Sequence, residues 1–586
     1  MFSNSILATA TNPSSQILTL SAVDLIVIIL YFAVVLAIGF YLKKFTSTGE
    51  EFFMAGRKMT AWIAGLSFIS ANLSSLETMG WSAMAYQYGM LGAHAYFIGA
   101  IPAILFLAVV MMPFYYICKT HSVPGYLKLR YGESSRALAG VSFTFMTVLV
   151  CGVNMFAMAK VMQIILGWNI HFSIWVSSIT VAVYVALGGL LSAVFNEVLQ
   201  FFLIWLGTLL IPILGLVEAG GWRKMIQSIN AQHPGENFTS LWSNLGSAAD
   251  NPMGMHWVGM VFGLGLAVSF GYWCTDFLQV QRVMAAKDLR SAQNGTIIGA
   301  ALKMMVPLIV TIPGLLGLAV LSQKAGITLV PESVAQATGG HSYNEVLPLM
   351  MARYLGPGLL GLGVTSMIAG FMSGMAGNVS AFATVWTYDV YRPLLNKNAT
   401  DAHYVSMGRW CSLIGVFIAI GTAYAAMLFS NILVYLQVLV MFFIVPLFGT
   451  VVLGMLWRRA SPAGGFWGFL SGIVASISMF LYVHTFPGGF DATQLNPDHV
   501  RHIATSPLAK DMAVNMFGGL WSLLICVAVT VVVSLLTRPK PDAELKNLVY
   551  GLTPLPDAGP TPWYGSPKLW AGVVGAALIV INIIFW

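Results

Sequence analysis

Long apolar segments dominate this chain and restrict the folds that it can adopt. A helix needs roughly 20 apolar residues to cross the hydrocarbon core of a bilayer. About fourteen segments reach that length, to within several residues at each end, and they lie near 22–42, 61–86, 93–117, 136–166, 170–188, 191–219, 255–281, 295–322, 358–388, 404–426, 431–456, 464–485, 515–536 and 567–585. Only 8% of the residues are charged, whereas a soluble domain carries about 25%. We therefore predict an all-α polytopic membrane protein with about 14 transmembrane helices.

The connections between these segments alternate in charge. Every second connection is basic, and these basic connections contain Lys43, Lys44, Arg57, Lys58, Lys119, Lys128, Arg130, Arg282, Lys287, Arg290, Arg392, Lys397, Arg458, Arg459, Arg538, Lys540 and Lys546. Because basic loops stay in the cytoplasm, both termini are expected outside, as an even number of spans requires. The net charge of +7 follows from these loops and predicts no nucleic-acid partner. We expect a multi-pass protein of the plasma membrane, such as the bacterial inner membrane.

Several classes of protein are disfavoured by what the chain lacks. The first 21 residues carry no charge and no basic segment, so we expect no cleaved signal peptide. The five cysteines lie in or beside apolar segments without metal-ligand spacing, which predicts neither disulfides nor a metal site. The sequence contains no HExxH motif, nucleophile elbow or phosphate loop. We therefore expect neither an enzyme nor a bound cofactor.

Two apolar segments contain a polar interruption, and they lie five spans apart. The second span is broken by small and polar residues around Asn72 and Glu77, and the seventh by a glycine-rich stretch that ends at Asp276. Such breaks expose backbone carbonyls for a cation and helix ends for a substrate. Packing of small residues between helices is the alternative, but it does not explain the buried charges.

The spacing of the two breaks predicts a transport core built from two five-helix repeats. We assign the core to residues 61–456, with repeat one at about 61–219 and repeat two at about 255–456. Residues 1–60 would form an extracellular tail and a peripheral helix, and residues 457–586 three peripheral helices with loops. The loop at about 323–357 is expected to place a short amphipathic helix, at 343–354, over the outer face.

Lys303 lies in the middle of an apolar run. A charged residue at membrane depth costs roughly 2.5 kcal/mol or more, so it usually faces a polar cavity and serves a function. The polar residues gather at mid-membrane between the two breaks instead of lining a continuous pore. This arrangement favours alternating access over a channel.

Several short motifs follow one another between about residues 20 and 485. They include Ser70-Ala-Asn72-Leu, Ser122-Val-Pro-Gly-Tyr-Leu-Lys-Leu-Arg130-Tyr-Gly, Tyr272-Trp273-Cys-Thr-Asp276, Val280-Gln-Arg282, Thr387-Tyr-Asp389-Val-Tyr391, Tyr435-Leu-Gln437 and Gly464-Gly-Phe-Trp-Gly468. In order and spacing they resemble the sodium/solute symporter family, and within it the sodium/glucose cotransporter branch. The resemblance implies a LeuT-type fold with a five-plus-five inverted repeat, and uptake of a small solute coupled to sodium.

The same resemblance implies a substrate site, and within this site the sequence departs from the family pattern at two positions. The implied sugar contacts are Asn72, Tyr272, Trp273, Lys303 and Gln437. We also predict Ser269 as a substrate-binding residue. Glu77 stands where sugar transporters have His or Gln, and Tyr96 stands where they have a sugar-binding Glu. We hypothesise that Glu77 replaces that acid, as a partner of substrate hydroxyls or of Lys303, since a buried ion pair avoids two unpaired charges.

The resemblance also implies a sodium site with one ligand missing. Backbone carbonyls of Ser70, Leu73 and Gly370 and the hydroxyl of Ser373 match the family ligands, but Gly374 lacks the second hydroxyl. Water, Ser70 Oγ or a nearby side chain could fill the gap, or the protein could bind sodium weakly or use protons.

Two acids are candidates for a role in coupling. Glu197 stands where relatives carry an Asp that assists cation coupling, and Asp276 ends the seventh span. Either acid could serve a proton or a second cation.

The sequence as a whole predicts a secondary active transporter that couples symport of a sugar or polyol to a cation, most simply sodium. A symporter of a carboxylate, an amino acid or another small polar solute is the alternative within transporters. A solute sensor that does not transport, built on the same scaffold, is the alternative outside them.

Overall fold

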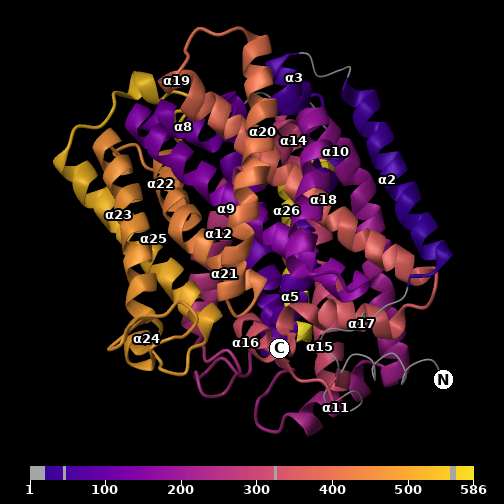
Figure 1. The fold of residues 1–586 in the computed structure, drawn as a ribbon. Coiled ribbons are helices and arrows are strands. Elements are labelled where there is room, and N and C mark those ends of the chain that lie inside the picture. Colours follow the sequence, from indigo (N-terminus) through magenta and orange to yellow (C-terminus); the bar gives the residue numbers. More distant parts are fainter. Residues whose placement is uncertain (1–19, 44–47, 322–325, 555–562) are drawn as a thin grey trace.

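Long helices crossing the molecule in roughly one direction make up most of this computed structural model, which describes residues 20–43, 48–321, 326–554 and 563–586 (Figure 1). Short elements gather at its two ends. One end holds α3 (Gly49–Met54), η1 (Ala55–Arg57), α8 (Val123–Arg130) and α19 (Arg392–Leu394), and the other holds α11 (Trp222–Gln232), α16 (Glu332–Thr338), α17 (Val346–Tyr354) and α24 (Pro497–Ala504). After the predicted topology, we call the first the inner end and the second the outer end.

Eleven helices of the described part of the chain are long and apolar enough to cross a membrane, or twelve if a bent pair counts as one span. The elements that form the eleven are α2 (Ala22–Lys43), the run from η3 to α7 (Ala95–Ile117), α9 (Glu133–Leu166), α10 (Ile170–Ala219), α14 and α15 (Leu289–Lys303 and Pro307–Val320), α18 and η8 (Leu359–Val385 and Trp386–Tyr391), α20 (Asp401–Ala423), the run from α21 to α22 (Ile432–Leu456), α23 (Pro462–Val483), α25 (Asp511–Leu536) and α26 (Pro567–Ile584). The protein is therefore an all-α polytopic membrane protein, as predicted.

The count differs from the predicted fourteen at two places. The second predicted span is divided into α4 (Ala61–Asn72) and α5 (Ser75–Tyr88), each too short to cross a membrane alone. The predicted spans 170–188 and 191–219 form one continuous helix, α10, within which only Leu190–Ala219 counts as a candidate span. No proline precedes Pro212 in this stretch, so the helix can continue past the predicted boundary.

The structure confirms both predicted helix breaks. Between α4 and α5, Leu73 leaves helical geometry and Ser74 is extended, with a hydroxyl that accepts a hydrogen bond from Glu77 N at 3.3 Å. This Ser-x-x-Glu pattern is a typical start of a helix, so the chain restarts a helix at mid-membrane. The other break joins η5 (Gly259–Ser269) and α12 (Phe270–Thr275) to α13 (Phe277–Met284), with a bend of 49° at Asp276.

The outer loop forms the short helix that the sequence predicts. It contains the parallel pair β1 (Leu329–Val330) and β2 (His341–Ser342), then η7 (Tyr343–Glu345) and α17. Lys160 of α9 forms ion pairs with Glu332 and Glu345, both at 3.0 Å. Burial opposes the ionisation of Glu345, but Lys160 and His341 lower its pKa to about 2. The cluster therefore stays charged near neutral pH and ties the loop to the helix bundle.

The start of α2 and the end of α26 both lie at the outer end. Asp24 accepts hydrogen bonds from the backbone N–H groups of Gly358 and Gly361, which begin α18 beside α17. At the other terminus Trp586 stacks on Trp242, with ring centroids 5.8 Å apart. The extracellular tail expected before α2 falls at residues 1–19, outside the described part of the chain.

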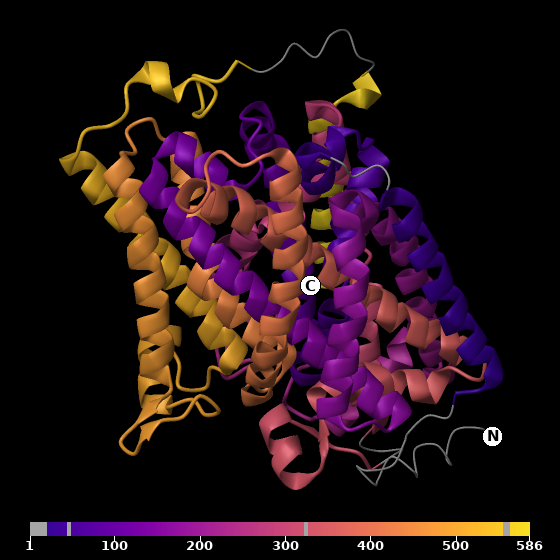
Figure 2. The same cartoon turned by 45° about the horizontal axis from the view of Figure 1, so that its top comes forward.

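α23 and α25 pack closely side by side at one edge of the molecule (Figures 1 and 2). A hairpin of β3 (Thr485–Phe486) and β4 (Gly489–Phe490) follows α23. Gly464, Gly468 and Gly472 form one stripe of α23 that faces α25. Glycines at this spacing let two membrane helices approach closely.

We expect Gly468→Leu to destabilise the protein by about 2 kcal/mol, since overpacking a core costs about 1–3 kcal/mol. A methyl group added at Gly468 would overlap Thr530 Oγ1 of α25. Thermal unfolding of the purified protein measures the effect. Gly421→Leu on α20 is the matched control, because a methyl group there meets no atom within 4 Å. Equal unfolding temperatures for the two variants would contradict the close packing of α23 on α25.

Candidate functional site

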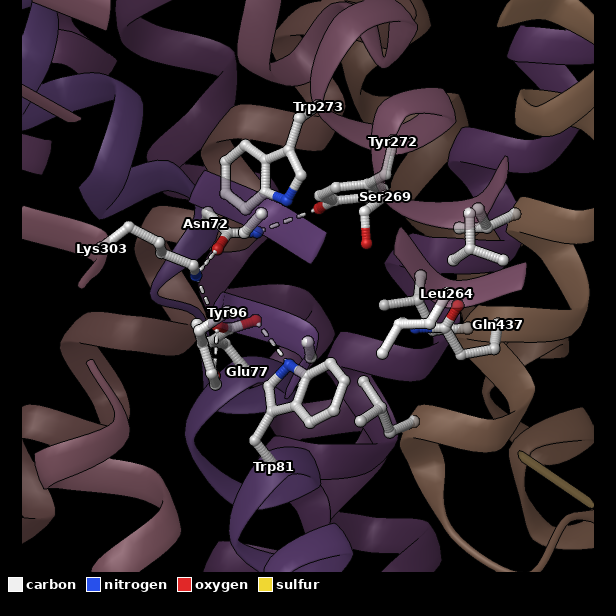
Figure 3. Close-up of a pocket in the computed structure, with 16 residues that line it drawn as sticks. Asn72, Glu77, Trp81, Tyr96, Leu264, Ser269, Tyr272, Trp273, Lys303 and Gln437 are labelled. Atoms are coloured by element: carbon white, nitrogen blue, oxygen red, sulfur yellow. Dashed lines mark hydrogen bonds and ion pairs between the residues drawn. The ribbon is translucent and has the colours of Figure 1, made fainter. Parts of the chain in front are cut away.

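A cavity with a mixed polar and apolar lining lies at mid-molecule between the two helix breaks (Figure 3). Its lining residues are Asn72, Glu77, Trp81, Ala95, Tyr96, Ala100, Leu264, Val268, Ser269, Tyr272, Trp273, Lys303, Leu433, Leu436, Gln437 and Val440. All eight residues that the sequence predicts for substrate binding are among them. The structure thus brings together side chains from segments more than 350 residues apart.

A buried ion pair forms one wall of the cavity. Lys303 Nζ lies 2.5 Å from Glu77 Oε1, and the exposed fractions of the two side chains are 1% and 8%. Lys303 is the last residue of α14 and Glu77 lies in the first turn of α5. Carbonyls at a helix C-terminus favour a cation and N–H groups at an N-terminus favour an anion, so each helix end stabilises its own charge. Pro307 at the start of α15 keeps the helix from continuing unbroken past Lys303.

The carboxylate of Glu77 has further donors. Tyr96 OH donates to Glu77 Oε1 at 2.8 Å, and Trp81 Nε1 donates to Glu77 Oε2 at 3.1 Å. Asn72 connects the ion pair to the opposite break: its Oδ1 accepts from Lys303 Nζ, and its Nδ2 donates to Tyr272 OH at 3.1 Å. Sequence reasoning missed Trp81, although its position four residues after Glu77 places both side chains on one face of α5.

Aromatic faces and one free amide complete the cavity. Lys303 Nζ lies 5.0 Å from the ring centroids of both Tyr96 and Trp273, within the range of cation–π attraction. Gln437 extends from α21 on the side opposite Lys303 (Figure 3). Its Oε1 is buried and has no hydrogen-bond partner among the residues that the structure describes. A ligand in the cavity can therefore meet an amide oxygen on one side and the Lys303 cluster on the other.

A second group of oxygens lies where α4 ends and α18 passes. Ser373 Oγ donates to the carbonyl oxygen of Ser70 at 2.9 Å and lies 3.2 Å from Ser70 Oγ. α18 approaches the break closely at Gly370, where an added methyl group would lie 3.0 Å from the carbonyl oxygen of Leu73. The four residues predicted as sodium ligands are thus buried together where the helix break meets α18, beside the cavity.

Comparison with known proteins identifies the family. The model of the sodium:solute symporter family matches residues 52–472. This chain belongs to the sodium:solute symporter family. The symporter is a membrane transporter and not an enzyme, as the sequence predicts, and it belongs to a family whose coupling ion is sodium.

The alignments of this symporter with its relatives cover most of its length. It is 27% identical to the sodium/mannose cotransporter SLC5A10 of Bos taurus, over 86% of this chain and 87% of the relative. It is 26% identical to sodium/glucose cotransporter 1 of Oryctolagus cuniculus, over 91% of this chain and 81% of the relative. It is also 26% identical to the sodium/myo-inositol cotransporter of Mus musculus, over 91% of this chain and 76% of the relative.

A solved structure shares the fold of the symporter. A Na⁺-coupled sialic acid symporter, in a substrate-bound outward-open state, matches with a TM-score of 0.70 and 19% identity, over 89% of this chain and 99% of that one. The LeuT-type fold expected from the sequence is therefore shown.

The two acids predicted for coupling lie outside the cavity of the symporter. Glu197 of α10 is fully buried and pairs with Arg282 of α13 at 2.7 Å, and Ser67 Oγ donates to it as well. The Asp276 carboxylate accepts a hydrogen bond from Leu278 N at 2.9 Å and so caps α13. The cap gives Asp276 a structural role, and a role in coupling stays a prediction for both Glu197 and Asp276.

Proposed function

We propose that this protein imports a neutral polyhydroxylated solute, a sugar or polyol, together with sodium. The observation that carries the substrate class is the Lys303–Glu77 pair at 2.5 Å. Because Glu77 neutralises the only cation that lines the described cavity, no net positive charge is left to hold a carboxylate substrate. Mannose, glucose and myo-inositol, the solutes named for the relatives, are all neutral polyhydroxylated molecules.

The remaining groups of the cavity suit hydroxyls and a ring. The amides of Asn72 and Gln437 can each donate to and accept from hydroxyl groups. The faces of Tyr272 and Trp273 can cover an apolar sugar face. A site of this kind discriminates strongly, because a missing hydroxyl leaves a buried polar group unpaired.

Sodium as the coupling ion is supported by the oxygen cluster at Ser70, Leu73 and Ser373. Hard cations take oxygen ligands, and broken helices of transporters supply them as backbone carbonyls. One positive charge moving inward gains roughly 2.3 kcal/mol per 100 mV. A tenfold ratio of solute concentrations costs about 1.4 kcal/mol, so this energy supports roughly fifty-fold accumulation of solute before the ion gradient is counted.

Uptake into proteoliposomes tests the proposal. The solutes are radiolabelled mannose, glucose, myo-inositol and sialic acid, and the driving force is an inward sodium gradient, an inward proton gradient or none. We expect accumulation of at least one neutral polyol with sodium alone, and no accumulation of the carboxylate. Accumulation of sialic acid alone would refute the substrate class. Proton-driven uptake without sodium would refute sodium as the coupling ion. Binding of a solute without its accumulation would indicate a sensor.

A further inference from the structure

The missing hydroxyl at Gly374 has a structural cause. A methyl group added at Gly374 would lie 2.5 Å from Ser74 Cβ, the residue that starts α5. The side chain of Ser74 therefore occupies the space that a serine at position 374 would need. The start of α5 and α18 are in close contact here, which leaves no room for a side chain at position 374. A further ligand for the cation must therefore come from another element.

Asn154 of α9 lies next to this place. The methyl group added at Gly374 would be 3.2 Å from Asn154 Oδ1. Asn154 is 1% exposed, and its Nδ2 donates to the carbonyl oxygen of Val150 at 3.2 Å. This bond fixes the orientation of the amide, so that Oδ1 points away from its own helix.

Asn154 Oδ1 has no hydrogen-bond partner in the described ranges of the chain. Buried acceptors almost always have a partner, and an acceptor without one commonly marks a water or an ion. The amide oxygen also resembles the backbone carbonyls of the cluster in charge and hardness.

We propose that Asn154 supplies, through Oδ1, the cation ligand that Gly374 lacks. The inference rests on the proposed sodium coupling and adds to it a ligand from a third helix. The sodium site then consists of the carbonyls of Ser70, Leu73 and Gly370, the hydroxyl of Ser373 and the amide oxygen of Asn154. Since all five ligands are neutral, the bound ion adds one full positive charge to the protein.

The test compares two variants of similar side-chain volume in the purified full-length protein. Thermal unfolding is measured in rising sodium chloride, with choline chloride keeping the ionic strength constant and without any sugar. Asn154→Leu keeps the packing but removes the oxygen, and we expect half-maximal stabilisation to need at least about tenfold more sodium. Asn154→Asp keeps an oxygen in place. For this variant we expect the sodium concentration that gives half-maximal stabilisation to lie within about threefold of the wild-type concentration.

A matched control and the contrary outcomes complete the test. Asn582 of α26 makes the same amide bond to the carbonyl four residues earlier, but its Oδ1 already accepts from Trp242. Asn582→Leu should therefore leave the sodium response unchanged. A wild-type response in Asn154→Leu, or an equal loss in Asn154→Asp, would refute Asn154 as a ligand. If wild type itself gains no stability from sodium, the proposed coupling ion fails, and the ligand assignment with it. Asn154→Ala replaces the leucine variant if that variant does not fold.

Discussion

Glu77→Gln is expected to abolish solute uptake and to destabilise the protein by about 3–5 kcal/mol, the usual cost of removing one partner of a buried ion pair. The substitution leaves the Lys303 ammonium, which is 1% exposed, without its counter-charge. Trp81 and Tyr96 donate to different oxygens of the carboxylate, and the single amide oxygen of glutamine keeps only one of these two bonds. The missing charge is the larger part of the loss. Thermal unfolding and uptake of the accumulated polyol measure the two effects.

The double variant Glu77→Gln/Lys303→Gln separates stability from function. With both charges removed, most of the lost stability should return, because replacing a whole buried pair by neutral groups is often close to neutral. Uptake should stay lost, since the ammonium of Lys303, a predicted contact of the solute, is gone. If the Glu77→Gln variant reached half-maximal uptake at the same solute concentration as wild type, the Lys303–Glu77 pair would not be part of the binding site.

Arg282→Met is expected to have a destabilising effect of similar size, about 3–5 kcal/mol. It leaves the Glu197 carboxylate unpaired in a place where both side chains have an exposed fraction of 0%. Among the residues that the structure describes, the hydrogen bond from Ser67 is then the one side-chain contact left to the carboxylate. The unfolding temperature of the purified variant measures this effect, and a change below about 1 kcal/mol would mean that water reaches Glu197.

The double variant Arg282→Met/Glu197→Gln also decides what Glu197 does. Stability should recover, because neither charge is left unpaired. If Glu197 assists coupling, the double variant needs at least about tenfold more sodium for half-maximal uptake. An unchanged sodium requirement would restrict Glu197 to holding α10 against α13.

Local polar signals in apolar surroundings predicted the helix breaks and the composition of the cavity. Ser74 and Glu77 form a helix-start pattern inside an apolar segment, and the chain restarts a helix at that point. Lys303 needs a partner at membrane depth, and the structure supplies Glu77. Such signals are strong because a membrane tolerates few polar groups.

The remaining features depend on three-dimensional packing that no local pattern encodes. Leu433 and Leu436 line the cavity but resemble any other apolar residue of their span. Asn154 is visible as an amide in a mostly apolar stretch of α9, yet the sequence does not tell which element it faces. The close contact of Ser74 with Gly374 joins residues 300 positions apart, and only the folded chain brings them together.

The self-neutralised cavity has an electrical consequence. The pairs Lys303–Glu77 and Arg282–Glu197 each sum to zero, and the proposed sodium ligands carry no charge. The empty carrier therefore moves no net charge at these sites when it reorients, whereas the loaded carrier moves one. Membrane voltage should then accelerate the inward step with cargo and leave the return step electrically silent.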